Sequence, residues 1–189
     1  MRKFVALAIM LALAGCAQSF QLQKAGRSSM WKSYSVATSE DINELVSEQA
    51  VAWSQYGPIL EIVNFWKPVK EGAVLPFTYR AGNAAKAPKY RSGMSPEEII
   101  EIYRTSVGLT GRVITATSRL QPIQIGAQQG YQFDMESSSP DGMDFKSRIL
   151  FAVVVDELYL IDLTANATHY FTSRLPAFDM MVSTIEFNG

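Results

Sequence analysis

The chain has 189 residues, of which 48% are hydrophobic, and its 17 Lys and Arg against 18 Asp and Glu give a formal net charge of −1. This balance lacks the basic excess typical of nucleic-acid-binding proteins, so we expect no nucleic-acid partner. The single Cys and the single His exclude intrachain disulfides and His-rich metal sites.

The N-terminus has the order of charge and hydrophobicity seen in exported proteins. Arg2 and Lys3 precede an apolar run, Phe4 to Leu13, that is too short to span a bilayer, and Leu13-Ala14-Gly15-Cys16 follows. This order resembles a bacterial lipoprotein signal peptide that ends in a lipobox. The resemblance implies that residues 1–15 are removed and that Cys16 is acylated at its thiol and at the new amine.

Acylation of Cys16 sets the expected location and domain organisation. Several acyl chains anchor a protein stably, so we expect a chain tethered to the membrane without spanning it. The resemblance implies outer-membrane sorting, facing the periplasm, because Ala17 stands where an inner-membrane protein tends to have Asp. Residues 16–30 are rich in Gln, Ser and Gly and predict a flexible tether, and residues 31–189 predict one folded domain.

Strand patterns open the expected domain. Residues 34–38 predict a strand, and residues 50–54 and 59–69 predict a hairpin around the turn Gln55-Tyr56-Gly57-Pro58. In the second arm Ile62, Asn64 and Trp66 share one face while Val63 and Phe65 share the other. We therefore expect both faces of this arm to be partly covered.

The segment from Gly72 to Pro96 contains no acidic residue, and aromatic side chains alternate with its cations. Such a pattern suits an anionic, partly apolar partner, such as lipid phosphates, acidic glycans or an acidic protein face. The alternative is a solvated loop whose aromatic side chains pack back onto the core. The candidate binding surface comprises Phe77, Tyr79, Arg80, Lys86, Lys89, Tyr90 and Arg91.

A helix follows this segment. Ser95 is the expected N-cap, Pro96 the first helical residue and Glu98 the partner in a capping box. Apolar residues then recur at helical spacing up to Gly108, so the pattern predicts an amphipathic helix.

In the second half of the chain, apolar and polar residues alternate with period two, and this pattern predicts an antiparallel meander. The expected strands are residues 113–120, 130–136, 143–155 and 158–164, joined by turns at Pro122, at Pro140-Asp141-Gly142 and at Asp156-Glu157. Pro176 is expected to open a closing helix, with Leu175, Phe178, Val182 and Ile185 on one stripe.

The order of helix, meander, aromatic segment and closing helix, with a last strand reading Leu158-Tyr159-Leu160-Ile161-Asp162-Leu163, resembles the superfamily of the photosystem II subunit PsbP and the periplasmic lipoprotein DcrB. The resemblance implies an α+β fold, an α/β/α sandwich with a central antiparallel sheet. It covers residues 94–187 best and carries no functional residue over. Its known members are accessory and assembly proteins more often than enzymes.

Catalytic and metal-binding patterns are few. The chain has no nucleophile elbow and no glycine-rich phosphate loop, so we expect no cofactor. His169 is expected to be a loop residue rather than a general base. Asp134, Glu136, Asp141 and Asp144 are expected to be a hydrated hairpin rather than a calcium site, and we expect no metal.

We therefore expect a non-catalytic accessory or assembly factor that is held at the envelope by Cys16 and contacts an envelope protein or an anionic envelope component. The alternative is a carrier for a small amphiphile bound between sheet and helix by Trp66, Phe151 and Tyr159. A hydrolytic enzyme is the weakest hypothesis. A deep pocket would favour the carrier, and a flat surface with a basic, aromatic rim would favour the accessory factor.

Overall fold

A computed structural model describes residues 19–80 and 82–188, with Arg80 described for its backbone only. The predicted lipobox, Leu13 to Cys16, lies outside the described residues. Within the described part, none of the helices is long and apolar enough to cross a membrane.

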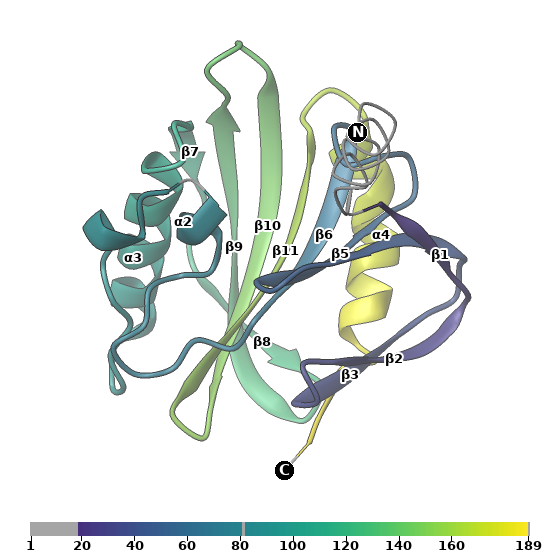
Figure 1. Cartoon of the computed structure of the whole chain (residues 1–189), viewed down its shortest axis with the longest axis horizontal. Coiled ribbons are helices and arrows are strands. Elements are labelled where there is room, and N and C mark those ends of the chain that lie inside the picture. The colour runs from purple at the N-terminus through teal and green to yellow at the C-terminus, as the bar shows by residue number, and fades with distance from the viewer. Residues whose placement is uncertain (1–18, 81, 189) are drawn as a thin grey trace, which may run out of the picture.

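An antiparallel sheet of nine strands forms the centre of the molecule (Figure 1). Its strand order is β1-β4-β5-β6-β11-β10-β9-β7, and β8 pairs with β9 outside this path. The strands are β1 Gln21–Gln23, β4 Ile42–Val46, β5 Ala50–Ser54, β6 Glu61–Trp66, β7 Val113–Thr117, β8 Gln121–Ile125, β9 Gln128–Ser138, β10 Asp144–Val154 and β11 Glu157–Asn166. A second sheet has the order β12-β3-β2, with β12 Glu186–Phe187, β3 Tyr34–Thr38 and β2 Gly26–Met30.

Helices cover both faces of the central sheet. Helix α3, Pro96–Gly108, lies on one face with the short helix α2, Phe77–Arg80, and the 3-10 turn η1, Ala84–Lys86. Helix α4, Tyr170–Val182, and the small sheet lie on the other face (Figure 1). Alternate residues of a strand point to opposite faces, so the sheet separates two hydrophobic cores.

Several predicted elements are confirmed. The backbone N–H of Glu98 donates to Ser95 Oγ at 3.3 Å, and the N–H of Ser95 donates to the Glu98 carboxylate at 2.8 Å, which completes the capping box. Strands β5 and β6 form the expected hairpin, and β9, β10 and β11 form the expected meander. The central antiparallel sheet is therefore present.

The tether prediction is wrong for residues 21–30. Strand β1 pairs with β4 and β2 pairs with β3, and Met30 is fully buried. These strands are short, polar and largely exposed at sheet edges, where backbone pairing rather than a hydrophobic pattern holds them. The folded domain therefore begins before Trp31.

Three local predictions fail, two of them at proline residues. Helix α4 begins at Tyr170 with Pro176 inside it, because the packing of its first turns, including Phe171, against the core outweighs the missing N–H. Pro122 lies in strand β8 rather than in a turn, which an edge strand tolerates. The turn between β10 and β11 is centred on Val155 and Asp156, both with positive φ, one residue earlier than expected.

Candidate functional site

A strip of polar side chains crosses the sheet face that α2 and α3 cover. Asp162 on β11 lies opposite Asn64 on β6, and Thr164 on β11 lies opposite Ser147 on β10. All four side chains are buried. The strip is therefore built by direct cross-strand neighbours in the middle of the sheet.

Neutral donors surround the Asp162 carboxylate, which is 3% exposed. Trp66 Nε1 donates to Oδ1, and Asn64 Nδ2 and Thr164 Oγ1 each donate to Oδ2 at 3.1 Å. No ion pair to Asp162 occurs among the residues that the structure describes. In the same part of the chain, Asn64 Oδ1 is buried and accepts no hydrogen bond.

Burial dominates the electrostatics of the strip. Desolvation raises the pKa of Asp162 above its ordinary value, although the donors of Trp66, Asn64 and Thr164 and the charge of Arg112 act in the opposite direction. Burial, together with the nearby Asp162, raises the pKa of Tyr103 well above its ordinary value. Tyr103 is therefore a neutral phenol at physiological pH.

The strip forms the floor of a pocket of about 360 Å³, which we call the Asp162 pocket. Its walls include the rings of Trp66, Phe77 and Tyr103, packed edge to face with centroid separations of 5.4 Å and 5.3 Å. Arg112, which follows α3, also lines the pocket, and its guanidinium lies 4.4 Å from the centroid of the Phe145 ring. This volume lies in the range of small-molecule sites, about 300 to 1,000 Å³.

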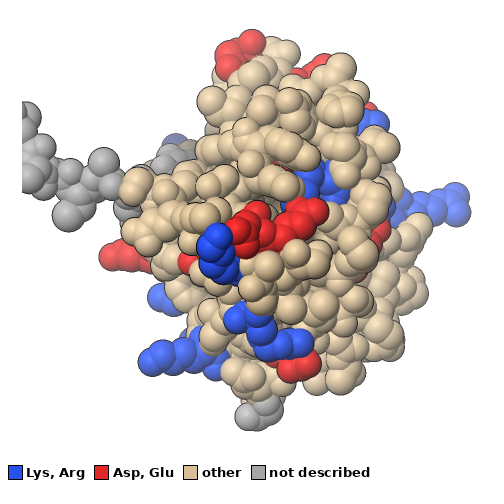
Figure 2. Space-filling model, turned by 90° about the vertical axis from the view of Figure 1, so that its right-hand side faces the viewer, with Lys and Arg blue, Asp and Glu red and all other residues tan. Residues whose placement is uncertain are grey.

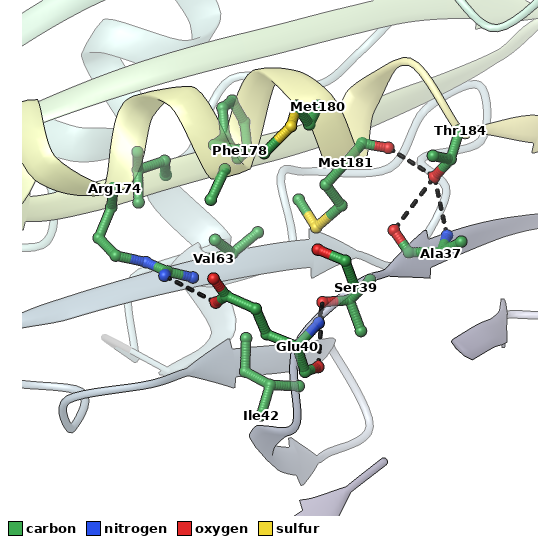
Figure 3. A pocket seen from close by; sticks show the side chains of 13 residues that line it. Ala37, Ser39, Glu40, Ile42, Val63, Arg174, Phe178, Met180, Met181 and Thr184 are labelled. Atoms are coloured by element: carbon green, nitrogen blue, oxygen red, sulfur yellow. Dashed lines mark hydrogen bonds and ion pairs between the residues drawn. The ribbon is translucent and has the colours of Figure 1, made fainter. Parts of the chain in front are cut away.

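A second cavity, of about 290 Å³, lies on the opposite side of the sheet between α4 and the segment that joins β3 to β4. Figure 2 shows this side of the molecule, where acidic and basic side chains gather around a hollow. In Figure 3, Arg174 extends from α4 toward Glu40, and Phe178 and Met181 cover Val63. The cavity is thus largely apolar with a charged end.

The charges at that end are already compensated. The Arg174 guanidinium lies 3.1 Å from Glu40 Oε2 and 3.8 Å from the buried Glu61 Oε2, and it also donates to Gln55. Glu61 in turn accepts hydrogen bonds from Ser54 and from backbone N–H groups. The Asp162 pocket, in contrast, contains a carboxylate without an ion-pair partner and an amide oxygen without a donor among the described residues, and we take it as the candidate site.

The candidate surface predicted from residues 72–96 is corrected in part. Phe77 and Tyr90 belong to the core beneath α3, with 9% and 0% exposure, because α2, η1 and a bridge between Val74 and Lys89 fold this segment onto the domain. Tyr79 is 52% exposed. The side chains of Lys86, Lys89 and Arg91 are also at least partly exposed, and that of Arg80 lies outside what the structure describes.

The histidine and the carboxylates considered as alternative catalytic or metal sites do not come together in one site. His169 is exposed ahead of α4, and among the described residues no hydrogen bond joins its ring to a serine or a carboxylate. Asp134 pairs with Arg148 and Glu136 with Lys146, whereas Asp144 and Asp141 accept from Ser138 and Ser139. Within the described chain, no group of three or more His, Cys, Asp and Glu side chains is placed to hold a metal ion.

Of the three residues predicted for a carrier, only Trp66 lines the Asp162 pocket. Phe151 is buried in the core beside it, and Tyr159 lies in the core on the opposite face. Sequence reasoning missed Asp162 itself. The signal was present, because a carboxylate inside the apolar run 158–163 is costly to bury unless it is paired or hydrogen-bonded, which predicts polar partners around it.

Comparison with known proteins gives structural similarities only. No family model matches the chain, and no curated protein matches it in sequence. The structure is similar to that of PsbP (CyanoP) from Synechocystis sp. PCC 6803, with 12% identity over 92% of this chain and 96% of that chain and a TM-score of 0.48. It is also similar to the Ran-binding protein Mog1p of Saccharomyces cerevisiae, with 9% identity, 89% and 96% coverage and a TM-score of 0.45.

Proposed function

We propose that this chain is a lipid-anchored protein of the bacterial envelope that binds and carries a small amphiphilic ligand in the Asp162 pocket, without catalysing a reaction. The observation that carries the proposal is a buried carboxylate, without an ion-pair partner in the described chain, on the floor of an aromatic pocket. A few polar groups converging in an apolar pocket are typical of small-molecule sites, and a buried acid with a raised pKa is typical of functional ones. The proposal thus favours the carrier over the accessory factor.

The proposed anchor rests on the sequence Leu13-Ala14-Gly15-Cys16. Lipid on Cys16 would hold the domain at the outer membrane, facing the periplasm. We also propose that the sheet, with α3 on one face and α4 on the other, is an α/β/α sandwich of the PsbP and DcrB type.

Mass spectrometry of the N-terminal peptide tests the anchor. We expect a mature chain that starts at an acylated Cys16, and an unlipidated, uncut chain for Cys16→Ala. An unmodified Cys16 in the wild-type protein, or a mature chain that starts elsewhere, would contradict the proposal.

A docking role is the second candidate function, favoured by the exposed side chains of Tyr79, Lys86, Lys89 and Arg91. An acidic or anionic envelope component is the partner that these cations suit. If this surface docks a partner, changing the three cations to Ser abolishes co-purification of envelope components and leaves thermal melts nearly unchanged. Co-purification that survives both the substitutions and high salt would rule this surface out.

Thermal melts test the carrier function. A ligand present at about 100 times its Kd stabilises the folded state by about 2.7 kcal/mol, which raises the Tm of a domain this size by roughly 5 to 10 °C. The probes are 2-phenylethylamine, 2-phenylethanol, 3-phenylpropionate, octylamine, octanol and octanoate. We expect at least one of them to stabilise the protein.

A variant in which the pocket is blocked tests whether this binding occurs in the Asp162 pocket. Thr110 is exposed and lines the pocket, so Thr110→Trp is expected to fill the entrance and abolish the stabilisation. Thr105 is exposed on α3 and does not line the pocket, which makes Thr105→Trp the matched control. Failure of all six probes to stabilise the wild-type protein, or equal stabilisation of Thr110→Trp, would overturn the proposed function.

A further inference from the structure

We infer that the ligand of the Asp162 pocket is a small primary amine with an apolar body, and that its ammonium group pairs with the Asp162 carboxylate. The inference rests on the proposed function and names the chemical class of its ligand. It goes beyond the general amphiphile, because it assigns a positive charge to the polar end.

The floor of the pocket presents hydrogen-bond acceptors, which suit a ligand whose polar head group is rich in hydrogen-bond donors. Asp162 Oδ1 accepts one hydrogen bond in the structure, and Asn64 Oδ1 is buried with none in the described part of the chain. Each of these oxygens has two lone pairs, so both retain capacity. An ammonium group has three N–H donors and no acceptor, which complements this arrangement.

The negative charge of Asp162 favours an ammonium head group over a hydroxyl or a carboxylate head group. The Asp162 carboxylate has lost its water on folding and has no protein cation within 4.0 Å among the described residues. A bound ammonium gains the attraction of this charge in a poorly solvated site without desolvating the carboxylate again. A hydroxyl head gains only a hydrogen bond, and a carboxylate head meets a like charge.

The walls suit a cation with an apolar body. Trp66, Phe77 and Tyr103 present aromatic rings around the pocket, and cations are attracted to aromatic faces. The rest of the wall includes aliphatic side chains such as Ile62 and Val107. The pocket thus offers an apolar enclosure next to a negative charge.

Arg112 is the cation that lines the pocket, and it is half-buried against Phe145. Its charge acts on Asp162 without forming an ion pair. An ammonium ligand meets some repulsion from it, but Arg112 also lowers the pKa of Asp162. We therefore expect Arg112→Gln to bind the amine several-fold more tightly at a pH high enough to keep Asp162 ionised in the variant. Weaker binding by this variant at such a pH would contradict a cationic ligand.

Isothermal titration calorimetry with three matched probes tests the inference. 2-Phenylethylamine, 2-phenylethanol and 3-phenylpropionate share a phenyl ring and a short linker and differ in the charge of the head. We expect the amine to bind at least tenfold more tightly than either of the others. We also expect Asp162→Asn to lose at least tenfold in amine affinity, and Asp141→Asn, a change on an exposed turn, to lose none.

The pH dependence of amine binding to the wild-type protein keeps the test independent of the folding of any variant. Besides Asp162, the ionisable groups lining the pocket are Arg112 and Tyr103, and burial raises the pKa of Tyr103 well above its ordinary value, so Tyr103 stays neutral in the acid range. Amine affinity is expected to fall as the pH drops and Asp162 takes up a proton, whereas 2-phenylethanol affinity stays nearly constant. Amine affinity that does not change with pH would overturn the inference.

The outcomes separate the two proposals. Tighter binding of 2-phenylethanol or 3-phenylpropionate, lost in Thr110→Trp, would overturn the amine and leave the carrier function standing. Absence of binding by every probe of the melting series would overturn the carrier function and the inference with it.

Discussion

Burying the Asp162 carboxylate lowers the stability of the folded chain at neutral pH. The pKa of Asp162 is raised on folding, so between the unfolded and the folded pKa the native state binds more protons than the unfolded state. The free energy of unfolding therefore falls as the pH rises through this window, and the loss is complete above the folded pKa. A ligand that pairs with the carboxylate explains why the chain retains a buried charge that costs stability.

Asp162→Asn tests this cost directly. An asparagine keeps the shape and removes the charge. Its Oδ1 can accept from Trp66, but its Nδ2 cannot accept the hydrogen bonds that Asn64 Nδ2 and Thr164 Oγ1 donate to Asp162 Oδ2. We therefore expect the stability of the variant, measured relative to the wild type, to be higher at pH 7 than at pH 4, where the wild-type carboxyl takes up its proton. Urea melts across this range measure it, and a variant that is less stable at pH 7 than at pH 4, relative to wild type, would contradict the assignment.

A substitution at Gly126 tests the close contact between the β8–β9 turn and the residues that follow α4. Its φ is +58°, and an added Cβ would clash with the backbone carbonyl of Ile185. Gly126→Ala is expected to cost about 2 to 4 kcal/mol, from the left-handed backbone and from overpacking. Gly72 has φ +76° and open space around it, so Gly72→Ala is the control, with a cost of about 1 to 2 kcal/mol. Equal costs in denaturant melts would place the turn away from Ile185.

Local signals predicted single elements well, and sequence-distant contacts set what they missed. The capping residues of α3 and the alternation of β9 to β11 are local, so the helix and the meander could be predicted. Burial of Phe77 and Tyr90 depends on where the segment that carries α2 folds onto α3, which no local pattern encodes. The same holds for the site, because β6 and β11 are far apart in sequence and only the sheet brings Asn64 beside Asp162.

Helix α3 covers the candidate site. Its N-terminal cap and the hydrophobic core beneath it are expected to contribute unequally to stability. Ser95→Ala removes one capping hydrogen bond at an exposed helix end and is expected to cost about 1 kcal/mol. Phe151→Ala leaves a cavity beneath Tyr131, where the rings are stacked 5.5 Å apart, and is expected to cost about 3 to 5 kcal/mol. Similar small values for both in denaturant melts would mean that Phe151 does not belong to the core.

At the scale of the whole molecule, the central sheet separates the Asp162 pocket from the α4 side of the fold. The Asp162 pocket lies on the α3 face, whereas the Arg174 cavity, α4 and the small sheet lie on the other. Trp31 and Trp53 pack in the α4-side core, and their indole N–H groups donate to Phe65 O and to Glu44. Trp66 is thus the tryptophan that reports on the pocket.

The most direct measurement is a ¹H–¹⁵N correlation spectrum of the three tryptophan indoles during titration with 2-phenylethylamine at pH 7. The Trp66 indole N–H donates to Asp162, so an ammonium on that carboxylate must change its environment. We predict a saturable shift of the Trp66 indole, assigned with Trp66→Phe, while the Trp31 and Trp53 signals stay in place. An unchanged Trp66 signal at saturating amine, or equal shifts of all three indoles, would contradict a ligand site at Asp162.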